Sequence, residues 1–327
     1  MKRIEAGSYY SYLPKGCKLC RRGAKLTLFI TGLCNNSCFY CPVSKQKFGK
    51  DVVFANEREV RCFEDFIAEV DLMSAEGVAI TGGEPLLKLD RVIDFAKISK
   101  DLGLHVHLYT SIPAREYLLD KIEIDEIRFH PPEFRDVEKF VDSIEVAKSL
   151  GIDVGFEIPA VTFEPRIVEI VNELDAFLNL NQLEASEANW FALEKHGFVI
   201  EDFFVEKTEI VKLYERAKKF HYCTARFKDS AQFRRRLIRM AMNHPDFYLV
   251  TRDGTLLCSR IEGDLEKAEE ILKRAKVEFK RFEDCIETTP EVAGSSLKEI
   301  LKSESLKVSL VERYPTVNRT IIELMWV

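Results

Sequence analysis

Glutamine and long apolar runs are both scarce in this sequence. Only three glutamines stand beside 48 Lys and Arg and 54 Asp and Glu residues, a bias found in proteins from hot environments. No stretch approaches the roughly 18 consecutive apolar residues that a membrane-spanning helix needs. Residues 1–8 also lack the apolar core of a signal peptide. We therefore expect a cytoplasmic protein that does not enter a membrane.

The sequence also lacks an excess of positive charge. Its net charge of −6 argues against a polyanion-binding surface over the whole protein, so any contact with nucleic acid would be local. The length of 327 residues, 46% of them hydrophobic, allows one large domain and a smaller one with ample cores. Nine cysteines in a chain of this character indicate metal ligands or reduced thiols rather than disulfides.

Three of the cysteines form a run that lacks a fourth member. Cys34, Cys38 and Cys41 have the spacing C-x3-C-x2-C, and a compact loop of this kind lets each thiolate bind a different iron of a [4Fe–4S] cluster. Because no fourth cysteine follows, one iron would stay open to a small molecule. The alternative is a zinc knuckle, but structural zinc sites have four closed ligands, usually as paired C-x2-C units. The run therefore favours the cluster.

A cysteine loop and a glycine-rich loop each follow a strand-like segment. Residues 26–31 form a short apolar run before the cysteines, and residues 77–81 form another before Gly82-Gly83-Glu84-Pro85. With these two motifs at this separation, the chain resembles the radical SAM superfamily over roughly residues 20 to 190. Members carry CxxxCxxC in the first βα loop and a GGEP-type motif after the second strand. More narrowly, it is similar to archaeal uncharacterised proteins related to pyruvate formate-lyase activating enzyme.

The resemblance implies a chemistry. A reduced [4Fe–4S] cluster on Cys34, Cys38 and Cys41 would give one electron to S-adenosylmethionine, breaking its C5′–S bond. The resulting 5′-deoxyadenosyl radical would take a hydrogen atom from a substrate, while the protein positions the cofactor and excludes solvent. Such an enzyme needs an electron donor such as ferredoxin or flavodoxin. The substrate stays open between RNA, a peptide or protein, and a small molecule.

The resemblance also suggests which residues bind the cofactor. Tyr40 occupies the position where family members line the adenine, although a loop aromatic could simply pack on the barrel. Gly82 and Gly83 leave room for the backbone to approach the methionine amino group. Glu84 or a nearby carbonyl could accept hydrogen bonds from that group.

Polar residues at the ends of further strands complete the candidate site. Thr110, Ser111 and Glu157 could bind the ribose hydroxyls or the methionine end of the cofactor, or they could be polar strand ends that meet solvent. His130 and Glu184 could face the substrate, although many histidines are structural.

Strand-like and helix-like segments alternate along the first two thirds of the chain. The six strands expected are residues 26–31, 78–81, 105–110, 126–130, 153–158 and 182–186. This alternation predicts an α/β fold. We expect a partial (βα)6 TIM-like barrel of the radical SAM type, with its functional loops at the C-terminal strand ends.

The last third predicts a small α+β accessory domain, of ferredoxin-like type. Residues 247–250 and 256–259 flank Asp253-Gly254, a hairpin signal. A helix over 265–275, a β-like stretch over 277–285 and a last strand over 320–325 follow. We expect an N-terminal segment over 1–25, the barrel over 26–220, a basic helical connector over 221–245 and the accessory domain over 246–327.

A second metal site is the next hypothesis. Cys17 and Cys20 form a CxxC pair, which is half of a zinc site, an iron site or a second iron–sulfur cluster. Cys223 and Cys258 could complete it. The alternative is a reduced pair of thiols in an N-terminal loop.

The segment 226–239 carries a local charge of +5. Its central arginines, Arg234, Arg235 and Arg236, could bind RNA phosphates or an acidic substrate, or they could form an ordinary solvated helix face. The rival to an enzyme is a non-catalytic RNA adaptor that uses the cysteines for structural zinc and this helix for contact.

Overall fold

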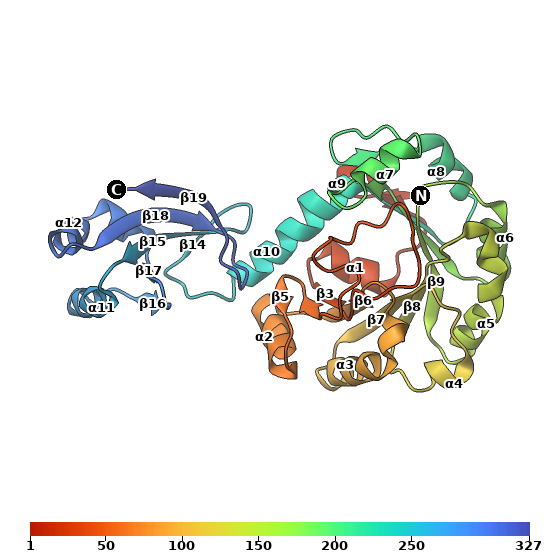
Figure 1. The fold of residues 1–327 in the computed structure, drawn as a ribbon, viewed down its shortest axis with the longest axis horizontal. Coiled ribbons are helices and arrows are strands. Elements are labelled where there is room, and N and C mark those ends of the chain that lie inside the picture. Colours follow the sequence, from red (N-terminus) through yellow and green to blue (C-terminus); the bar gives the residue numbers. More distant parts are fainter. The chain divides into compact units, whose positions relative to one another are not determined.

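The computed structural model describes all 327 residues and divides them into two compact units (Figure 1). The first consists of residues 1–71 and 75–233, and the second of residues 72–74 and 234–327. Each unit has its own sheet. None of the helices combines the length and the apolar character that crossing a bilayer requires.

The first unit is an open barrel of parallel strands. In spatial order these strands are β3 (Lys25–Phe29), β6 (Gly77–Thr81), β7 (His105–Thr110), β8 (Glu126–Phe129), β9 (Asp153–Pro159), β10 (Phe177–Asn181) and β13 (Phe220–Cys223). β4 (Phe54–Ala55) and β5 (Arg58–Glu59) extend the β3 edge, while β2 (Tyr9–Tyr10) and β1 (Lys2–Arg3) extend the β13 edge. The expected partial barrel is confirmed.

The alternation of side chains along the strands explains this arrangement. In β7 the apolar Val106 and Leu108 are fully buried, while His107 and Tyr109 point to the other face. Helices cover the outer, apolar face: α2 (Phe63–Met73), η2 (Pro85–Lys88), α3 (Leu89–Asp101), α4 (Glu116–Leu119), η3 (Phe134–Phe140), α5 (Val141–Ser149), α6 (Pro165–Glu173) and α8 (Thr208–Tyr214). The inner face is therefore polar.

The sixth strand lies earlier than expected, and a seventh follows it. Helix α6 ends at Glu173, Asp175 has a positive φ of 48°, and β10 occupies Phe177–Asn181. The expected strand at 182–186 was wrong; those residues begin an insertion with β11 (Leu183–Glu184), α7 (Trp190–Lys195) and β12 (Phe204–Val205). The expected boundary at residue 220 falls at the start of β13, which belongs to the barrel sheet.

The N-terminal segment is part of the barrel. Helix α1 (Lys15–Arg21) packs against β3, β6 and β7 and lies within the curve of the strands (Figure 1). A Cβ on Gly16 would come within 2.7 Å of the Arg128 guanidinium and 2.8 Å of the His107 ring, so only glycine allows this close docking. Because His107 and Gly16 meet near the start of the strands, α1 fills that end of the barrel.

The second unit is an antiparallel sheet with helices, in agreement with the expected α+β character. Its strands are β14 (Leu249–Val250), β15 (Leu256–Glu262), β16 (Phe279–Arg281), β17 (Ile286–Thr288), β18 (Lys307–Arg313) and β19 (Ile321–Trp326). Its helices are α10 (Arg234–Ala241), α11 (Leu265–Arg274), η5 (Pro290–Gly294) and α12 (Ser296–Ser303). The predicted hairpin at Gly254 joins β14 to β15.

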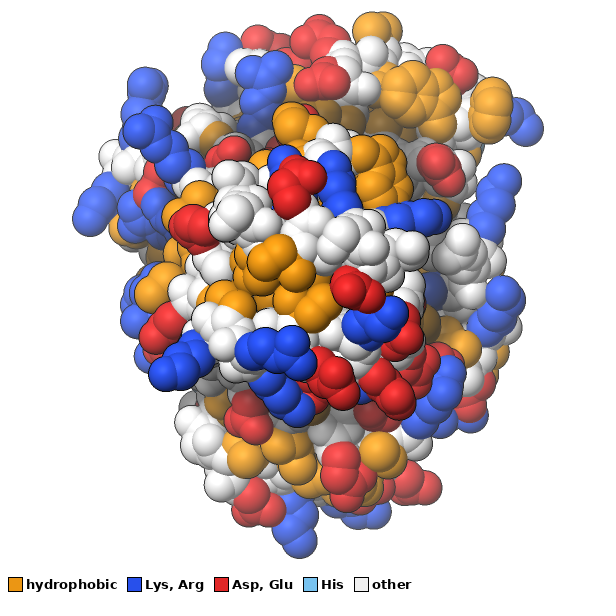
Figure 2. Space-filling model, turned by 90° about the vertical axis from the view of Figure 1, so that its left-hand side faces the viewer, with side chains coloured by type: hydrophobic (Ala, Val, Ile, Leu, Met, Phe, Trp, Pro, Cys, Tyr) orange, Lys and Arg blue, Asp and Glu red, His pale blue; other side chains and the backbone are white.

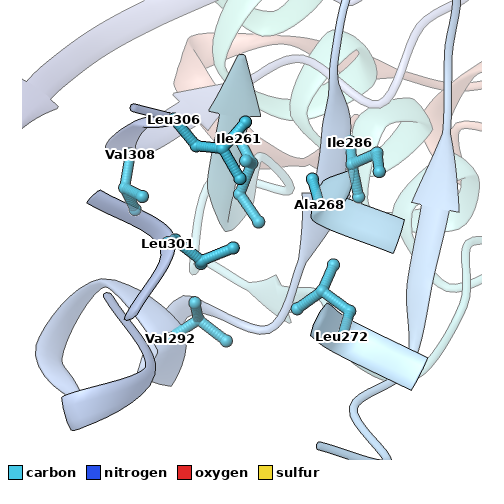
Figure 3. Close-up of a cluster of buried hydrophobic side chains, with 8 residues drawn as sticks. All are labelled: Ile261, Ala268, Leu272, Ile286, Val292, Leu301, Leu306 and Val308. Atoms are coloured by element: carbon cyan, nitrogen blue, oxygen red, sulfur yellow. The ribbon is translucent and has the colours of Figure 1, made fainter. Parts of the chain in front are cut away.

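A dry apolar cluster holds this unit together (Figure 3). Its members come from β15, β17, β18, α11, α12 and the segments beside them: Ile261, Ala268, Leu272, Ile286, Val292, Leu301, Leu306 and Val308. The side chains of α11 and α12 point toward the strands, which gives the unit a core of its own.

Candidate functional site

A cavity of about 740 Å³ opens at the C-terminal ends of the barrel strands. It lies opposite the end that α1 fills, where parallel barrels place their functional loops. Most of the residues singled out in the sequence line it: Cys34, Cys38, Tyr40, Cys41, Gly82, Gly83, Glu84, Thr110, Ser111, His130, Glu157 and Glu184.

The cysteine loop leaves β3 and forms one wall of the cavity. Cys34, Cys38 and Cys41 are all free thiols with partial exposure. Two local bonds fold the loop: the Cys41 N–H donates to the Cys38 carbonyl (3.0 Å), and the Asn36 N–H donates to the Cys34 sulfur (3.4 Å). Three thiols on one compact loop beside a cavity of ligand size suit a cluster, because each has to reach a different iron.

Gly82 and Gly83 bring two loops into backbone contact. A Cβ on Gly82 would lie 2.5 Å from the Thr31 carbonyl oxygen, and one on Gly83 would lie 2.3 Å from that of Leu33. The Gly83 N–H donates to Thr31 (2.7 Å) and the Glu84 N–H to Leu33 (2.8 Å). The glycines were expected to make room for a methionine amino group; the structure adds that they are needed to join the two loops.

Glu84 organises the end of β7. Its carboxylate is almost wholly buried and accepts four hydrogen bonds, from the Leu86 N–H, the Thr110 hydroxyl, and both the N–H and the hydroxyl of Ser111. The Asn36 side chain in turn donates to the Ser111 hydroxyl (2.7 Å). One carboxylate therefore ties the glycine-rich loop to β7 and, through Ser111, to the cysteine loop.

Tyr40 and His130 form a hydrogen-bonded pair across the cavity wall. The His130 Nδ1 atom lies 2.9 Å from the Glu157 carbonyl oxygen, which can only accept, so Nδ1 carries the proton. Burial lowers the pKa of His130, and the neutral ring then accepts at Nε2 from the Tyr40 hydroxyl (3.1 Å). Both ring nitrogens are engaged, so His130 positions Tyr40.

Glu157 is held by a buried arginine that the sequence reading did not single out. Arg128 donates to Glu157 (2.5 Å), to the Tyr109 hydroxyl (2.9 Å) and to Glu126 (2.6 Å). Burial alone would raise the pKa of Glu157, but Arg128, Lys25 and an Asn181 hydrogen bond outweigh it and lower the pKa to about 2. Glu157 therefore faces the cavity as a carboxylate.

The hydrogen bonds around Arg128 extend to the end of the barrel that α1 fills. Glu126 also accepts from the Gly16 N–H at the start of α1 (2.9 Å), and Arg128 donates to the Cys17 sulfur (3.3 Å). The sequence contains a pattern that predicts this network, because β8 and the residue after it alternate Glu126, Arg128 and His130 with two apolar residues. Period-two alternation with charged residues facing inward indicates a polar barrel interior.

The structure places the four cysteines of the expected second metal site in two different units. Cys17 and Cys20 lie on α1 inside the barrel, and Cys223 ends β13, but Cys258 is fully buried in the apolar core of the second unit. Burial raises the pKa of Cys17 to about 12, which favours a protonated thiol. Nowhere do three His, Cys, Asp or Glu side chains converge so that they could hold a single metal ion.

The arginine segment does not line the cavity. Arg234 donates to the Arg252 carbonyl (2.9 Å) and pairs with Asp253 (3.3 Å), and both Arg235 and Arg236 have partners as well. On the face of the molecule shown in Figure 2, acidic and basic side chains are interspersed with apolar ones. From the basic segment only Lys228 reaches the cavity, where it pairs with Glu184.

The insertion at residues 182–207 packs against the cysteine loop. The Phe39 ring, between Cys38 and Tyr40, stacks on His196 with 4.0 Å between ring centroids. The Asn189 side chain, buried, donates to the Tyr40 carbonyl (2.9 Å). Because these residues look like ordinary loop residues in the sequence, no motif pointed to them.

Comparisons with known proteins show which families the chain matches. A sequence model of the radical SAM superfamily matches residues 28–187, and a domain of unknown function (DUF8061) matches residues 254–326. The chain is 35% identical to a protein of Methanocaldococcus jannaschii that carries the provisional name glycyl-radical enzyme activating enzyme, over 96% of this chain and 92% of that one.

Two more distant matches cover smaller parts of this chain. A GTP 3′,8-cyclase of Staphylococcus aureus is 30% identical over 43% of this chain and 47% of its own. The crystal structure of Streptococcus suis SuiB bound to S-adenosylmethionine gives a TM-score of 0.42 at 11% identity, covering 63% of this chain and about half (52%) of that one.

An open parallel barrel with a three-cysteine loop and a glycine-rich loop at one cavity defines the class of enzyme. The chain belongs to the radical SAM superfamily. It is therefore an enzyme whose cofactors are a [4Fe–4S] cluster and S-adenosylmethionine, which sets aside the non-catalytic zinc adaptor.

Proposed function

We propose that this enzyme abstracts a hydrogen atom from a glycine in the main chain of a partner protein, with electrons from a ferredoxin- or flavodoxin-type donor. The observation that carries the proposal is the match along 96% of the chain to a relative named for activating glycyl-radical enzymes. The shorter match to a cyclase of a small nucleotide covers only 43% of the chain.

When bound, the cluster and S-adenosylmethionine would supply the chemistry: one electron from the donor would cleave the C5′–S bond, methionine would leave, and the hydrogen of the glycine Cα would move to C5′. The products are 5′-deoxyadenosine and a glycine-centred radical in the partner protein. One external electron is consumed for each radical formed.

The residues of the chain would bind and position these groups. Cys34, Cys38 and Cys41 would hold three irons, and the Glu84 carboxylate fixes Thr110 and Ser111 at the same cavity. Tyr40, held by His130, would line the bound cofactor and help to exclude water. The buried Arg128 keeps Glu157 ionised at the cavity.

The rim of the cavity suits a protein. Ala188 and Ala192 line the cavity, while the neighbouring Phe191 is 81% exposed and Trp190 37% exposed. Phe48, on the cysteine-loop side, lines the cavity and is 46% exposed. Exposed aromatic side chains beside a cavity are typical of protein-binding surfaces.

Isotope transfer tests the proposal. The reconstituted anaerobic enzyme is incubated with dithionite, S-adenosylmethionine and a capped pentapeptide whose central glycine carries two deuterium atoms on Cα. We expect 5′-deoxyadenosine heavier by one mass unit, measured by mass spectrometry. The variant with Cys34, Cys38 and Cys41 all replaced by Ala is the control and should give no 5′-deoxyadenosine. Cleavage without deuterium transfer would contradict the glycine substrate.

A further inference from the structure

Three carboxylates line the cavity, and two of them accept hydrogen bonds from protein donors at both oxygens. Both oxygens of Glu84 accept two hydrogen bonds each, and Glu157 accepts from Arg128, Asn179 and Asn181. Glu184 differs. One of its oxygens pairs with Lys228, and no protein group donates to the other.

Lys228 is the cationic half of this pair. Its Nζ contacts Glu184 alone, so two of its three N–H bonds remain available. Both side chains are about one third exposed and both line the cavity. Although burial lowers the pKa of Lys228, the charge and hydrogen bond of Glu184, together with Cys223 and Glu157, outweigh it and raise the pKa above the usual value. The pair is therefore an ammonium beside a carboxylate.

The fold places the two groups at the ends of neighbouring strands. Glu184 follows β10 and Lys228 follows β13, and Asn181 at the end of β10 is in register with Cys223 at the end of β13. Lys228 begins a π-helical turn (Lys228–Phe233) just after α9 (Ala225–Phe227). Such turns are rare and occur frequently at functional sites.

We propose that Lys228 and Glu184 together bind the main-chain N–H and C=O of one substrate residue, either the glycine that loses its hydrogen or the residue that follows it. The ammonium donates to that C=O, and the free oxygen of Glu184 accepts from that N–H. This inference rests on the proposed glycine substrate and names the groups that orient it. In an extended chain the N–H and C=O of one residue point to the same side, so a donor and an acceptor side by side are complementary to them.

The charges favour a peptide over a phosphate. The pair carries no net charge, and Glu184 would repel an anion that approached Lys228. The neutral N–H and C=O of one residue can bind both groups without breaking their ion pair, whereas a phosphate would have to displace Glu184. A hydrogen bond to a charged group also contributes more to the binding free energy than a hydrogen bond between neutral groups.

Two altered peptides test the amide contact directly. In one, sarcosine replaces the glycine and removes its N–H; in the other, lactic acid replaces the residue that follows and converts its N–H into an ester oxygen. Deuterium transfer to 5′-deoxyadenosine is measured for each, as kcat/KM. With the wild-type enzyme one of the two should react about tenfold more slowly than the parent peptide, or slower still.

Variants of the pair complete the test. Glu184→Ala should lower kcat/KM for the parent peptide by about tenfold and abolish the difference between the parent and the altered peptide. The double exchange Glu184→Lys with Lys228→Glu restores an ion pair. It should therefore restore kcat/KM if the pair has only a structural role, but not if the pair binds the substrate. Glu206→Gln, whose carboxylate accepts from Gln182 (3.0 Å) outside the cavity, is the matched control and should behave as wild type.

The outcomes distinguish a failure of the proposed glycine substrate from a failure of the proposed contact with Lys228 and Glu184. No deuterium transfer from any peptide by the wild-type enzyme overturns the glycine substrate itself. Transfer that is equal for all three peptides, or full rescue by the exchanged pair, leaves the glycine substrate standing and overturns the amide contact.

Discussion

At the scale of single residues, the tightest constraint lies where the glycine-rich loop meets the cysteine loop. Gly83→Ala would place a Cβ 2.3 Å from the Leu33 carbonyl oxygen, so the cysteine loop must move. We expect a loss of about 1–3 kcal/mol of stability and less iron bound per chain, measured by urea unfolding and metal analysis. Gly294→Ala, where an added Cβ meets nothing, is the control. Equal iron content in the two variants would contradict this role.

Glu84 provides a second test at this scale. Glu84→Gln keeps the size of the side chain but turns one acceptor oxygen into a donor that faces the donors on Thr110 or Ser111. Because buried donors then lose their acceptor, we expect a cost of about 1–3 kcal/mol, seen as weaker S-adenosylmethionine binding in equilibrium dialysis. Glu84→Asp, which remains an acceptor, should bind better than Glu84→Gln. The reverse order would contradict it.

The sequence predicted the residues that carry motifs and missed those that act through contacts. Cys34, Cys38 and Cys41 were predicted because their spacing has a chemical meaning on its own. Lys228 was read as part of a basic run, and nothing local shows that the helix after β13 turns it into the cavity. Arg128 was missed because a buried charge becomes meaningful only when its partners on other strands are known.

At the scale of elements, the polar barrel interior makes stability depend on pH. His221 on β13 and His107 on β7 are buried, and neither ring has a hydrogen-bond partner in the protein. Burial lowers the pKa of His221 to about 3 and that of His107 well below its usual value. The unfolded chain binds these protons below about pH 6.5, whereas the folded chain does not.

The sign of the effect follows from that difference. Stability is complete above pH 6.5 and falls as the pH drops toward 3, with a slope of up to about 1.4 kcal/mol per pH unit for each histidine. His221→Phe should leave stability near wild type at pH 7.5 and make the fall between pH 6.5 and 4 shallower. Urea unfolding of the cluster-free triple cysteine variant measures this without interference from cluster loss. An unchanged slope would contradict it.

Elements were predicted where their own pattern is strong and missed where tertiary packing decides. β3, β6, β7, β8 and β9 lie where the sequence placed them. β10 was missed because Leu178 continues the apolar helical spacing of α6, although the positive φ at Asp175 ends that helix. Helix α1 was read as a metal-binding loop because C-x2-C spacing suits both a metal site and one turn of helix.

At the scale of the whole molecule, the chain contains two separate cores. The barrel interior is polar, filled by α1 at one end and open to the cavity at the other. The second unit has an apolar core and, beside it, one buried ion pair between Arg313 and Glu287, both at most 1% exposed. Because each unit has its own sheet and core, we expect two separate unfolding transitions.

The buried ion pair allows these transitions to be separated. Glu287 accepts from Arg313 (2.6 Å) and from the Tyr248 hydroxyl (2.7 Å). Glu287→Gln leaves the arginine charge buried without its counter-charge, which costs about 3–5 kcal/mol. We expect one calorimetric transition to move to lower temperature, while the iron–sulfur absorption of the barrel disappears at its original temperature.

The matched control is Glu299→Gln on α12, which removes a carboxylate from an exposed pair with Lys298 (3.6 Å) in the same unit. Because exposed ion pairs contribute little, this variant should unfold like wild type within about 0.5 kcal/mol. If Glu287→Gln lowers both transitions together, the two units unfold as one, and the separate cores do not make them separate folding units. If only the transition without iron–sulfur absorption moves, the second unit is stabilised by its own core and its own ion pair.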